Sequence, residues 1–259
     1  MNKMKIIGLL AIILILLGAG SVYAYTYSSQ LEEAMSLLLN SDYEGAIGEC
    51  KRLEEDFPAG PLRGEIMLLE GNCYMSLDDY EQARKSLKKA IPYAEKALLE
   101  EVYIAIADSY FSQQKYEDAV SIYKQLIEKK DEKDAKLCSL YFKIGRSYQK
   151  MSKWTDAEYY FSKLKKVFPK SFEVDLARRL SPEGNFFTIQ VGSFLEKENA
   201  EKLYAELKSK GYDAYLTFIK YEGQMLYRVR VGKFVSHMAT DYTEQRLKTE
   251  ENLPTHIFP

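Results

Sequence analysis

The sequence predicts a multidomain protein, in which an all-α helical solenoid is followed by a small α+β domain of βαββαβ order. Two observations carry this prediction. A short motif recurs four times through the middle of the chain, and the periodicity of apolar residues changes from helical to strand-like near residue 185. The chain has 259 residues, which is enough for more than one domain.

The first 24 residues have the composition of a targeting segment. Lys3 and Lys5 precede the uncharged apolar run Ile6–Leu17, and small residues follow up to Ala24. This order is typical of a secretory signal peptide that is cut after Ala24. The apolar stretch also continues for about 20 residues, the length of a membrane-spanning helix, so an uncut anchor in the inner membrane is the alternative. Either segment predicts that the remainder of the chain is exported, to a periplasmic or extracytoplasmic location.

An aromatic residue followed three positions later by alanine defines the recurring motif. The aromatic residues are Tyr43, Tyr80, Tyr116 and Trp154, which gives steps of 37, 36 and 38 residues. A spacing of three places both side chains of each copy on one helix face. A single helix pair cannot bury such a face alone, so the copies are expected to stack into a solenoid.

This motif resembles the tetratricopeptide repeat, a helix pair of about 34 residues. In that pattern the aromatic residue opens the second helix, and the first helix carries a bulky residue, a small residue and a tyrosine. The third copy supplies these as Tyr103, Ala107 and Tyr110, whereas the first copy is degenerate. The resemblance implies a repeat array over residues 27–180, with a groove for an exported protein partner that the sequence does not identify.

A further amphipathic helix is expected to cap the end of the array, because terminal repeats need a polar outer face. Ser171 is suited to the N-cap position, and Phe172, Leu176 and Leu180 are predicted to form the apolar stripe of this helix. The residues 181–185 contain proline, glycine and asparagine and are predicted to be a short linker.

The remaining residues, 186–259, alternate apolar and polar side chains in a pattern that predicts strands separated by helices. The expected elements are a strand from Phe187, a helix over Glu198–Lys210, strands over Asp213–Tyr221 and Met225–Phe234, a helix over Ala239–Glu251, and an edge strand over Pro254–Phe258. This order is that of the ferredoxin-like and RNA-recognition folds, with two helices on one face of a single sheet.

Two strand motifs in this region, Phe187–Phe194 (FTIQVGSF) and Tyr227–Phe234 (YRVRVGKF), resemble those of the SPOR domain. SPOR domains bind bacterial peptidoglycan, prefer glycan strands without stem peptides, and occur in proteins of cell division and the cell wall. The resemblance implies that the open face of the sheet binds such denuded glycan strands.

Strand alternation suggests which side chains lie on that face. If Ile189 and Val191 point to the helices, Gln190 and Arg228 point away from them. The resemblance implies glycan contacts from these residues and their neighbours: Gln190, Ser193 and Arg228, with Arg230 and Leu226 beside them. The second strand stays ambiguous, because either of two sets can face the helices: Ala214, Leu216 and Phe218, or Tyr215, Thr217 and Ile219.

Composition argues against two other functions. The net charge is −2, and residues 186–259 contain ten basic and ten acidic residues, so the electrostatic signature of nucleic-acid binding is missing. Two histidines and three cysteines without a C-x-x-C pair predict no metal site, and we expect no cofactor and no catalytic residues.

The expected function is therefore a non-catalytic envelope protein that binds peptidoglycan and recruits a protein partner. The alternative is a protein interaction scaffold without sugar binding.

Overall fold

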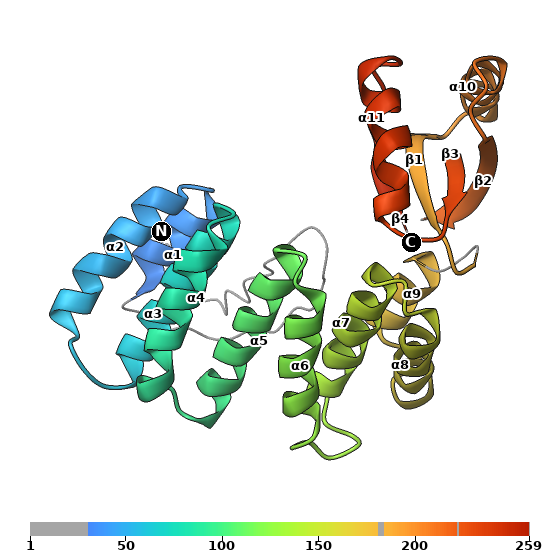
Figure 1. Ribbon diagram of the computed structural model, residues 1–259. Helices are drawn as coiled ribbons and strands as arrows, with labels where there is room; N and C mark the ends of the chain where they lie inside the picture. The colour runs from blue at the N-terminus through green and yellow to red at the C-terminus, as the bar shows by residue number, and fades with distance from the viewer. Residues whose placement is uncertain (1–30, 181–183, 222, 259) are drawn as a thin grey trace, which may run out of the picture. The chain divides into compact units, whose positions relative to one another are not determined.

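The computed structural model describes residues 31–180, 184–221 and 223–258 of the chain (Figure 1). The chain divides into two compact units, Met1–Ser147 and Tyr148–Pro259. The predicted targeting segment lies outside the described residues, and so do residues 181–183, the first three of the predicted linker. Within the described ranges, no helix is both long and apolar enough to cross a membrane.

The first unit is built from successive helix pairs, drawn in blue to green in Figure 1. Its helices are α1 (Glu32–Leu39), α2 (Tyr43–Asp56), α3 (Pro61–Ser76), α4 (Tyr80–Ala90), α5 (Lys96–Ser112) and α6 (Tyr116–Ile127), with the short 3-10 helix η2 (Ile91–Tyr93) after α4. Helix α7 (Lys136–Lys150) ends this unit and runs into the second, which continues with α8 (Trp154–Val167). The predicted solenoid of helix pairs is confirmed.

Each repeated aromatic residue opens the second helix of its pair, as the motif predicts. Tyr43, Tyr80, Tyr116 and Trp154 are the first residues of α2, α4, α6 and α8. The alanines three positions later are at most 2% exposed: Ala46, Ala83, Ala119 and Ala157. A methyl group at this position lets the two helices of a pair approach closely, which larger side chains would prevent.

The turn between the two helices also repeats, which the sequence did not reveal. Two residues before each aromatic residue the backbone is left-handed, with φ between 57° and 63°, at Ser41, Asp78, Gln114 and Ser152. The next backbone N–H donates to the carbonyl five residues earlier in all four copies, at 2.8 to 3.0 Å. This bond satisfies a carbonyl at the helix end that has no partner within the helix.

Polar side chains also link neighbouring repeats of the first unit. The guanidinium of Arg84 on α4 donates to Ser109 of α5 and to Gln113, the residue that follows α5, at 3.2 and 2.9 Å. The guanidinium carbon of Arg84 lies 4.6 Å from the centre of the Tyr110 ring on α5. A buried arginine is tolerated only when its donors find acceptors, and α5 supplies them here.

The second unit continues from α8 with α9 (Phe172–Leu180), where one prediction is wrong. Ser171 caps this helix as expected, since its Oγ accepts the backbone N–H of Val174 at 3.3 Å. Phe172, which is predicted to begin the apolar stripe, is 60% exposed, and Leu176 is only half-buried. Val174 and Ala177 are buried instead. They lie three positions apart and share a helix face, which is rotated around the helix axis from the face of the predicted stripe.

A four-stranded antiparallel sheet follows, in the order β2-β3-β1-β4. Its elements are β1 (Phe187–Phe194), α10 (Lys197–Ser209), β2 (Ala214–Tyr221), β3 (Gln224–Phe234), the 3-10 helix η3 (Met238–Thr240), α11 (Asp241–Thr249) and β4 (His256–Phe258). The predicted βαββαβ order is confirmed.

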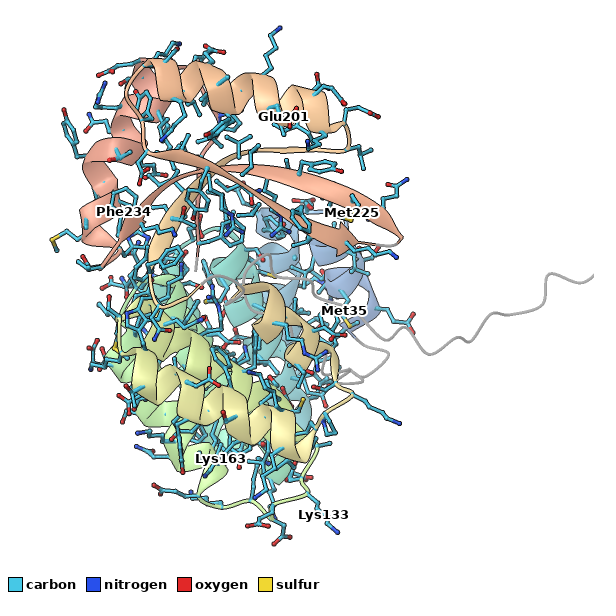
Figure 2. The ribbon with its side chains drawn as sticks, turned by 90° about the vertical axis from the view of Figure 1, so that its right-hand side faces the viewer. Met35, Lys133, Lys163, Glu201, Met225 and Phe234 are labelled. Atoms are coloured by element: carbon cyan, nitrogen blue, oxygen red, sulfur yellow. The ribbon has the colours of Figure 1, made fainter. Side chains whose placement is uncertain are left out.

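Both helices of this domain pack on one face of the sheet. Ala200 and Leu207 of α10 and Leu247 of α11 form a single apolar cluster with the strands. The strand residues of the cluster include Ile189, Val191, Ala214, Val229 and Val231. Figure 2 shows α10, labelled at Glu201, on one side of the sheet, with Met225 and Phe234 near the two ends of β3. The other face of the sheet is therefore not covered by these helices.

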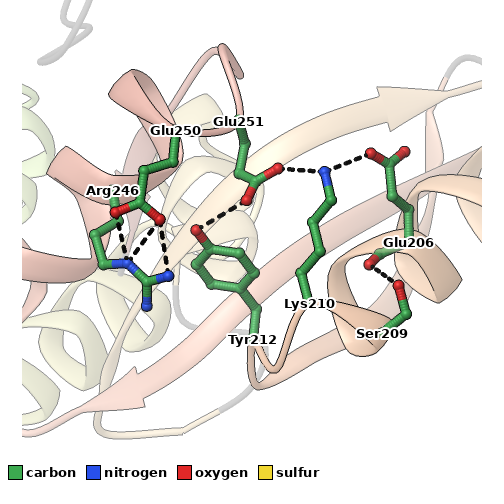
Figure 3. A network of polar contacts seen from close by, with 7 residues as sticks. All are labelled: Glu206, Ser209, Lys210, Tyr212, Arg246, Glu250 and Glu251. Atoms are coloured by element: carbon green, nitrogen blue, oxygen red, sulfur yellow. Dashed lines mark hydrogen bonds and ion pairs between the residues drawn. The ribbon is translucent and has the colours of Figure 1, made fainter.

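A chain of polar contacts joins the ends of α10 and α11 (Figure 3). Lys210 donates to both Glu206 and Glu251, and the hydroxyl of Tyr212 donates to Glu251 at 3.2 Å. On α11, Arg246 donates to Glu250 at 2.8 to 3.1 Å. These contacts stabilise ionised carboxylates at the surface, so they make stability sensitive to acid.

We expect the thermal stability of the sheet domain to decrease as the pH falls below about 4.5, the ordinary pKa of a glutamate side chain. The hydrogen bond from Lys210 lowers the pKa of Glu206, and the hydrogen bond from Arg246 lowers that of Glu250. A carboxylate with a lowered pKa in the folded state stabilises the fold above its unfolded-state pKa. That contribution is lost as the pH falls through the folded-state value.

Circular dichroism melting curves of the original chain and of a Glu206→Gln/Glu250→Gln variant would measure this effect. The variant should show a weaker dependence on pH between neutral and acid solution. Both carboxylates are exposed, so the difference should be small. If the melting temperature fell equally steeply with decreasing pH in the two proteins, the effect could not be assigned to Glu206 and Glu250.

Candidate functional site

The sheet face opposite α10 and α11, which we call the open face, carries the predicted binding residues. Successive side chains of a strand point to opposite faces, and cross-strand partners share a face. The open face is therefore formed by Thr188, Gln190 and Ser193 of β1, Tyr215, Thr217 and Ile219 of β2, Leu226, Arg228 and Arg230 of β3, and His256 and Phe258 of β4.

Two rows of paired residues cross this face. In the first row, Gln190 lies between His256 and Arg230, and Arg230 also pairs with Tyr215. In the second row, Arg228 lies between Ser193 and Thr217. The predicted residues Gln190, Ser193 and Arg228 are thus brought together near the centre of the sheet.

A β-bulge brings Ser193 to this face. Simple alternation from Gln190 would place Ser193 toward the helices. The register shifts between Gln190 and Gly192, so that Ser193 pairs with Arg228. Such a bulge inserts one extra residue into one strand and changes which face the following side chains take. Phe194 accordingly packs in the apolar cluster under the helices.

The structure resolves the ambiguity of the second strand. Ala214 is buried in the helix-facing cluster and Leu216 packs against it. The hydroxyl of Tyr215 donates to Oγ1 of Thr188 at 2.9 Å, on the open face. Tyr215, Thr217 and Ile219 therefore face away from the helices.

Arg230 lies on this face but is only 2% exposed. Its guanidinium carbon is 4.9 Å from the centre of the Phe258 ring, a cation–π arrangement across the sheet. Arg228 is half-buried and Ser193 is exposed. Of the two predicted arginines, Arg228 is the one with surface that a ligand can reach directly.

The buried polar atoms of the open face without a hydrogen-bond partner among the described residues include Oε1 of Gln190 and Oγ1 of Thr217. A buried polar atom without a partner costs about 1–3 kcal/mol, so such atoms are rare and require an explanation. A ligand that donates hydrogen bonds to Oε1 of Gln190 and Oγ1 of Thr217 would explain why these two atoms are buried without a partner inside the described part of the chain.

The described strands contribute basic but no acidic side chains to the open face. Arg228 and Arg230 belong to β3, and Nζ of Lys233 lies 5.4 Å from the centre of the Tyr215 ring. No described strand residue of the face is a carboxylate. The face thus combines positive charge, aromatic rings and hydroxyl groups.

Sequence reasoning missed Tyr215, Thr217, His256 and Phe258 as residues of this face. Tyr215 and Thr217 could not be assigned to the face because the alternation of the second strand is ambiguous. His256 and Phe258 could not be assigned because their place depends on the pairing of β4 with β1, which sets His256 opposite Gln190. Among the described residues, no cluster of three or more histidine, cysteine or acidic side chains could hold a metal ion.

The fold and the open face define a repeat protein of helix pairs that carries a small sheet domain, a combination of two binding modules. Family models agree with both parts: a tetratricopeptide repeat matches residues 64–96, 101–129 and 139–171, and a SPOR domain matches residues 183–254. The chain is a tetratricopeptide-repeat protein with a C-terminal SPOR domain. The α1–α2 pair lies outside these matches, in the copy that is degenerate in sequence.

Among solved structures, the crystal structure of MamA is similar to this chain at 21% identity. The likeness covers 56% of this chain and 82% of that chain, with a TM-score of 0.43. A comparison with curated proteins gives no match.

These modules define the general class of protein. SPOR domains bind peptidoglycan, and tetratricopeptide repeats bind protein partners. The chain is therefore a bacterial cell-envelope protein built from modules that typically bind rather than catalyse.

Proposed function

We propose that this protein docks on peptidoglycan glycan strands through the open face of its SPOR domain and holds a protein partner on its repeats. It would act without catalysis, in cell division or cell-wall organisation, after export across the inner membrane or while anchored in it. The observation that carries the proposal is Oε1 of Gln190, which is buried and has no hydrogen-bond partner within the described ranges. It belongs to a row of polar and aromatic residues that crosses the sheet.

The chemistry of the open face suits a glycan strand. The amide of Gln190 offers both a donor and an acceptor, as N-acetyl groups and sugar hydroxyls require. Ser193 is exposed beside Arg228 and offers a hydroxyl that both donates and accepts. The planar guanidinium of Arg228 offers several donors in a fixed geometry. These groups come from two adjacent central strands, which hold them rigidly relative to each other.

Co-sedimentation of the full-length chain with purified sacculi, before and after an amidase removes the stem peptides, tests this proposal. We expect more protein in the pellet with stripped sacculi. We expect Gln190→Ala and Arg228→Ala each to lower this binding about tenfold, since loss of a buried hydrogen-bond partner costs about 1–3 kcal/mol and about 1.4 kcal/mol corresponds to a factor of ten. Lys202→Ala is the matched control, because Lys202 is exposed on α10, away from the open face.

A second candidate function is an envelope scaffold that binds proteins but no sugar. The burial of Arg230 favours this alternative, because a covered guanidinium is not directly open to a ligand. The same experiment distinguishes the two functions. A chain that stays in the supernatant with both kinds of sacculi would exclude glycan docking and leave the scaffold function.

A further inference from the structure

We propose that Trp154 docks the SPOR domain on the last helix pair of the repeats, and that protonation of His237 releases it. The inference concerns how the two binding modules are joined, so it goes beyond the proposed function. It rests on contacts within the second compact unit, which contains both α8 and the sheet domain.

The aromatic residue that opens the second helix of each pair has a partner outside the repeats in the last copy. Trp154 is the only tryptophan of the chain, and the other three copies have tyrosine at this position. The centre of its ring lies 5.3 Å from that of Phe187, the first residue of β1, and the ring planes are tilted by 55°. Aromatic pairs at such separations contribute about 0.5–1.5 kcal/mol beyond the area that they bury. A residue of the repeat motif therefore contributes directly to the packing of the sheet domain.

Phe187 connects this contact to the loop that follows β3. Its side chain is fully buried, and its ring meets the ring of His237 edge to face, with the centres 5.8 Å apart. The carbonyl of His237 accepts hydrogen bonds from the backbone N–H and the hydroxyl of Thr240, at 2.9 and 2.6 Å, which fix the loop in this position. A half-buried imidazole beside a buried phenyl ring is favoured in its neutral form, because a charge there loses hydration.

The charged groups that act on His237 within the described ranges come from α7 and α11, whereas β1 presents the uncharged ring of Phe187. Lys150 is the last residue of α7, and Asp241 and Glu244 lie in the first turn of α11. Burial lowers the pKa of His237 from its ordinary value of 6.5, and the positive charge of Lys150 lowers it further. The two carboxylates oppose this shift without cancelling it.

Acid should therefore weaken the docked arrangement. Release would return the imidazole of His237 to water, so the released form would bind a proton more readily than the docked form. The docked form keeps its full stability above about pH 6.5 and loses it as the pH falls through the lower docked-state pKa. One proton is linked to release, so the ratio of docked to released chains can fall by at most about tenfold for each pH unit.

Trp154 reports this contact directly, because it is the only source of tryptophan fluorescence in the chain. Acrylamide quenching of the full-length chain would be measured between about pH 8 and pH 5, the range in which histidine titrates. We expect the quenching constant to rise along a one-proton curve with its midpoint below 6.5. Small-angle X-ray scattering should show a larger radius of gyration over the same interval, since a released domain is no longer held against α8.

The chain contains only two histidines, which provide a matched pair of variants. His237→Gln cannot acquire a charge at this position, so it should keep Trp154 protected from acrylamide at every pH. His256→Gln should keep the pH response of the original chain. A quenching constant that acid leaves unchanged in the original chain would overturn the inference, and so would a response that persists in His237→Gln.

Two further readings separate release from other effects of acid. Circular dichroism should stay constant across the pH range, and a loss of helix signal that accompanies the exposure of Trp154 would mean unfolding and would overturn release. An indole as accessible at neutral pH as free tryptophan would overturn docking itself. None of these measurements involves glycan, so their outcome is independent of the proposed function.

Discussion

Replacing Lys143 by methionine is expected to lower the free energy of unfolding of the first unit by about 2–3 kcal/mol. The ammonium of Lys143 on α7 donates to both carboxylate oxygens of Asp108 on α5, at 2.6 and 2.8 Å. The hydroxyl of Tyr123 on α6 donates to the same carboxylate. Lys143 and Tyr123 are 4% and 1% exposed, so the contact joins three helices in a largely dry environment.

The large effect follows from the charge that remains. Methionine preserves most of the apolar stem of Lys143 but removes the ammonium, which leaves the negative charge of Asp108 with one neutral donor. Breaking a fully buried pair in this way costs about 3–5 kcal/mol, and the partial exposure of Asp108 reduces the expected loss.

Urea unfolding followed by circular dichroism would measure this loss. Replacing both Lys143 by methionine and Asp108 by leucine should restore part of the stability, because no charge is then left unpaired. The control is Lys165→Met, which removes an exposed ion pair with Glu158 at 3.6 Å and should cost less than about 1 kcal/mol. Equal losses in the two single variants would contradict the role of the buried contact.

Alanine is expected to have opposite effects at two helical glycines of the first unit. A Cβ added to Gly71 on α3 would lie 2.7 Å from Cγ of Leu87 and 3.3 Å from the carbonyl oxygen of Ala83, both on α4. Leu87 is fully buried, so the two helices must move apart. A Cβ added to Gly48 on α2 would meet no atom within 4 Å.

We expect Gly71→Ala to destabilise the first unit by about 1–2 kcal/mol, because overpacking outweighs the better helix propensity of alanine. Gly48→Ala should stabilise it by about 0.5–1 kcal/mol, since only the propensity changes. Urea unfolding of both variants would measure the difference. Destabilisation of similar size at both positions would show that close packing of α3 on α4 is not the cause of the loss in Gly71→Ala.

Much of the fold could be predicted from the sequence, because it depends on local periodicity. The aromatic residue at 43, 80, 116 and 154 opens a helix in every copy, and the alanine three positions later is always buried. Strand-like alternation after residue 185 gave the element order of the sheet domain. Both patterns arise because helices and strands repeat their side-chain directions at fixed intervals.

The positions of Gln190 and Arg228 on the open face also followed from alternation, because each belongs to a regular strand whose other side is clearly apolar. Ser193 could not be placed in this way. The β-bulge before it adds one residue to β1, which reverses the alternation of the side chains that follow. The second strand has apolar residues in both of its alternating sets, so its direction was decided only by packing against α10 and α11.

The sequence by itself therefore determined the repeats, the order of the elements and two central residues of the open face, because these depend on neighbours along the chain. Only the tertiary structure decided that Ser193 joins Arg228, that β4 brings His256 beside Gln190, and that Arg230 is buried against Phe258. These contacts join strands far apart in the chain. Their register is set by the packing of the whole sheet, which no local pattern records.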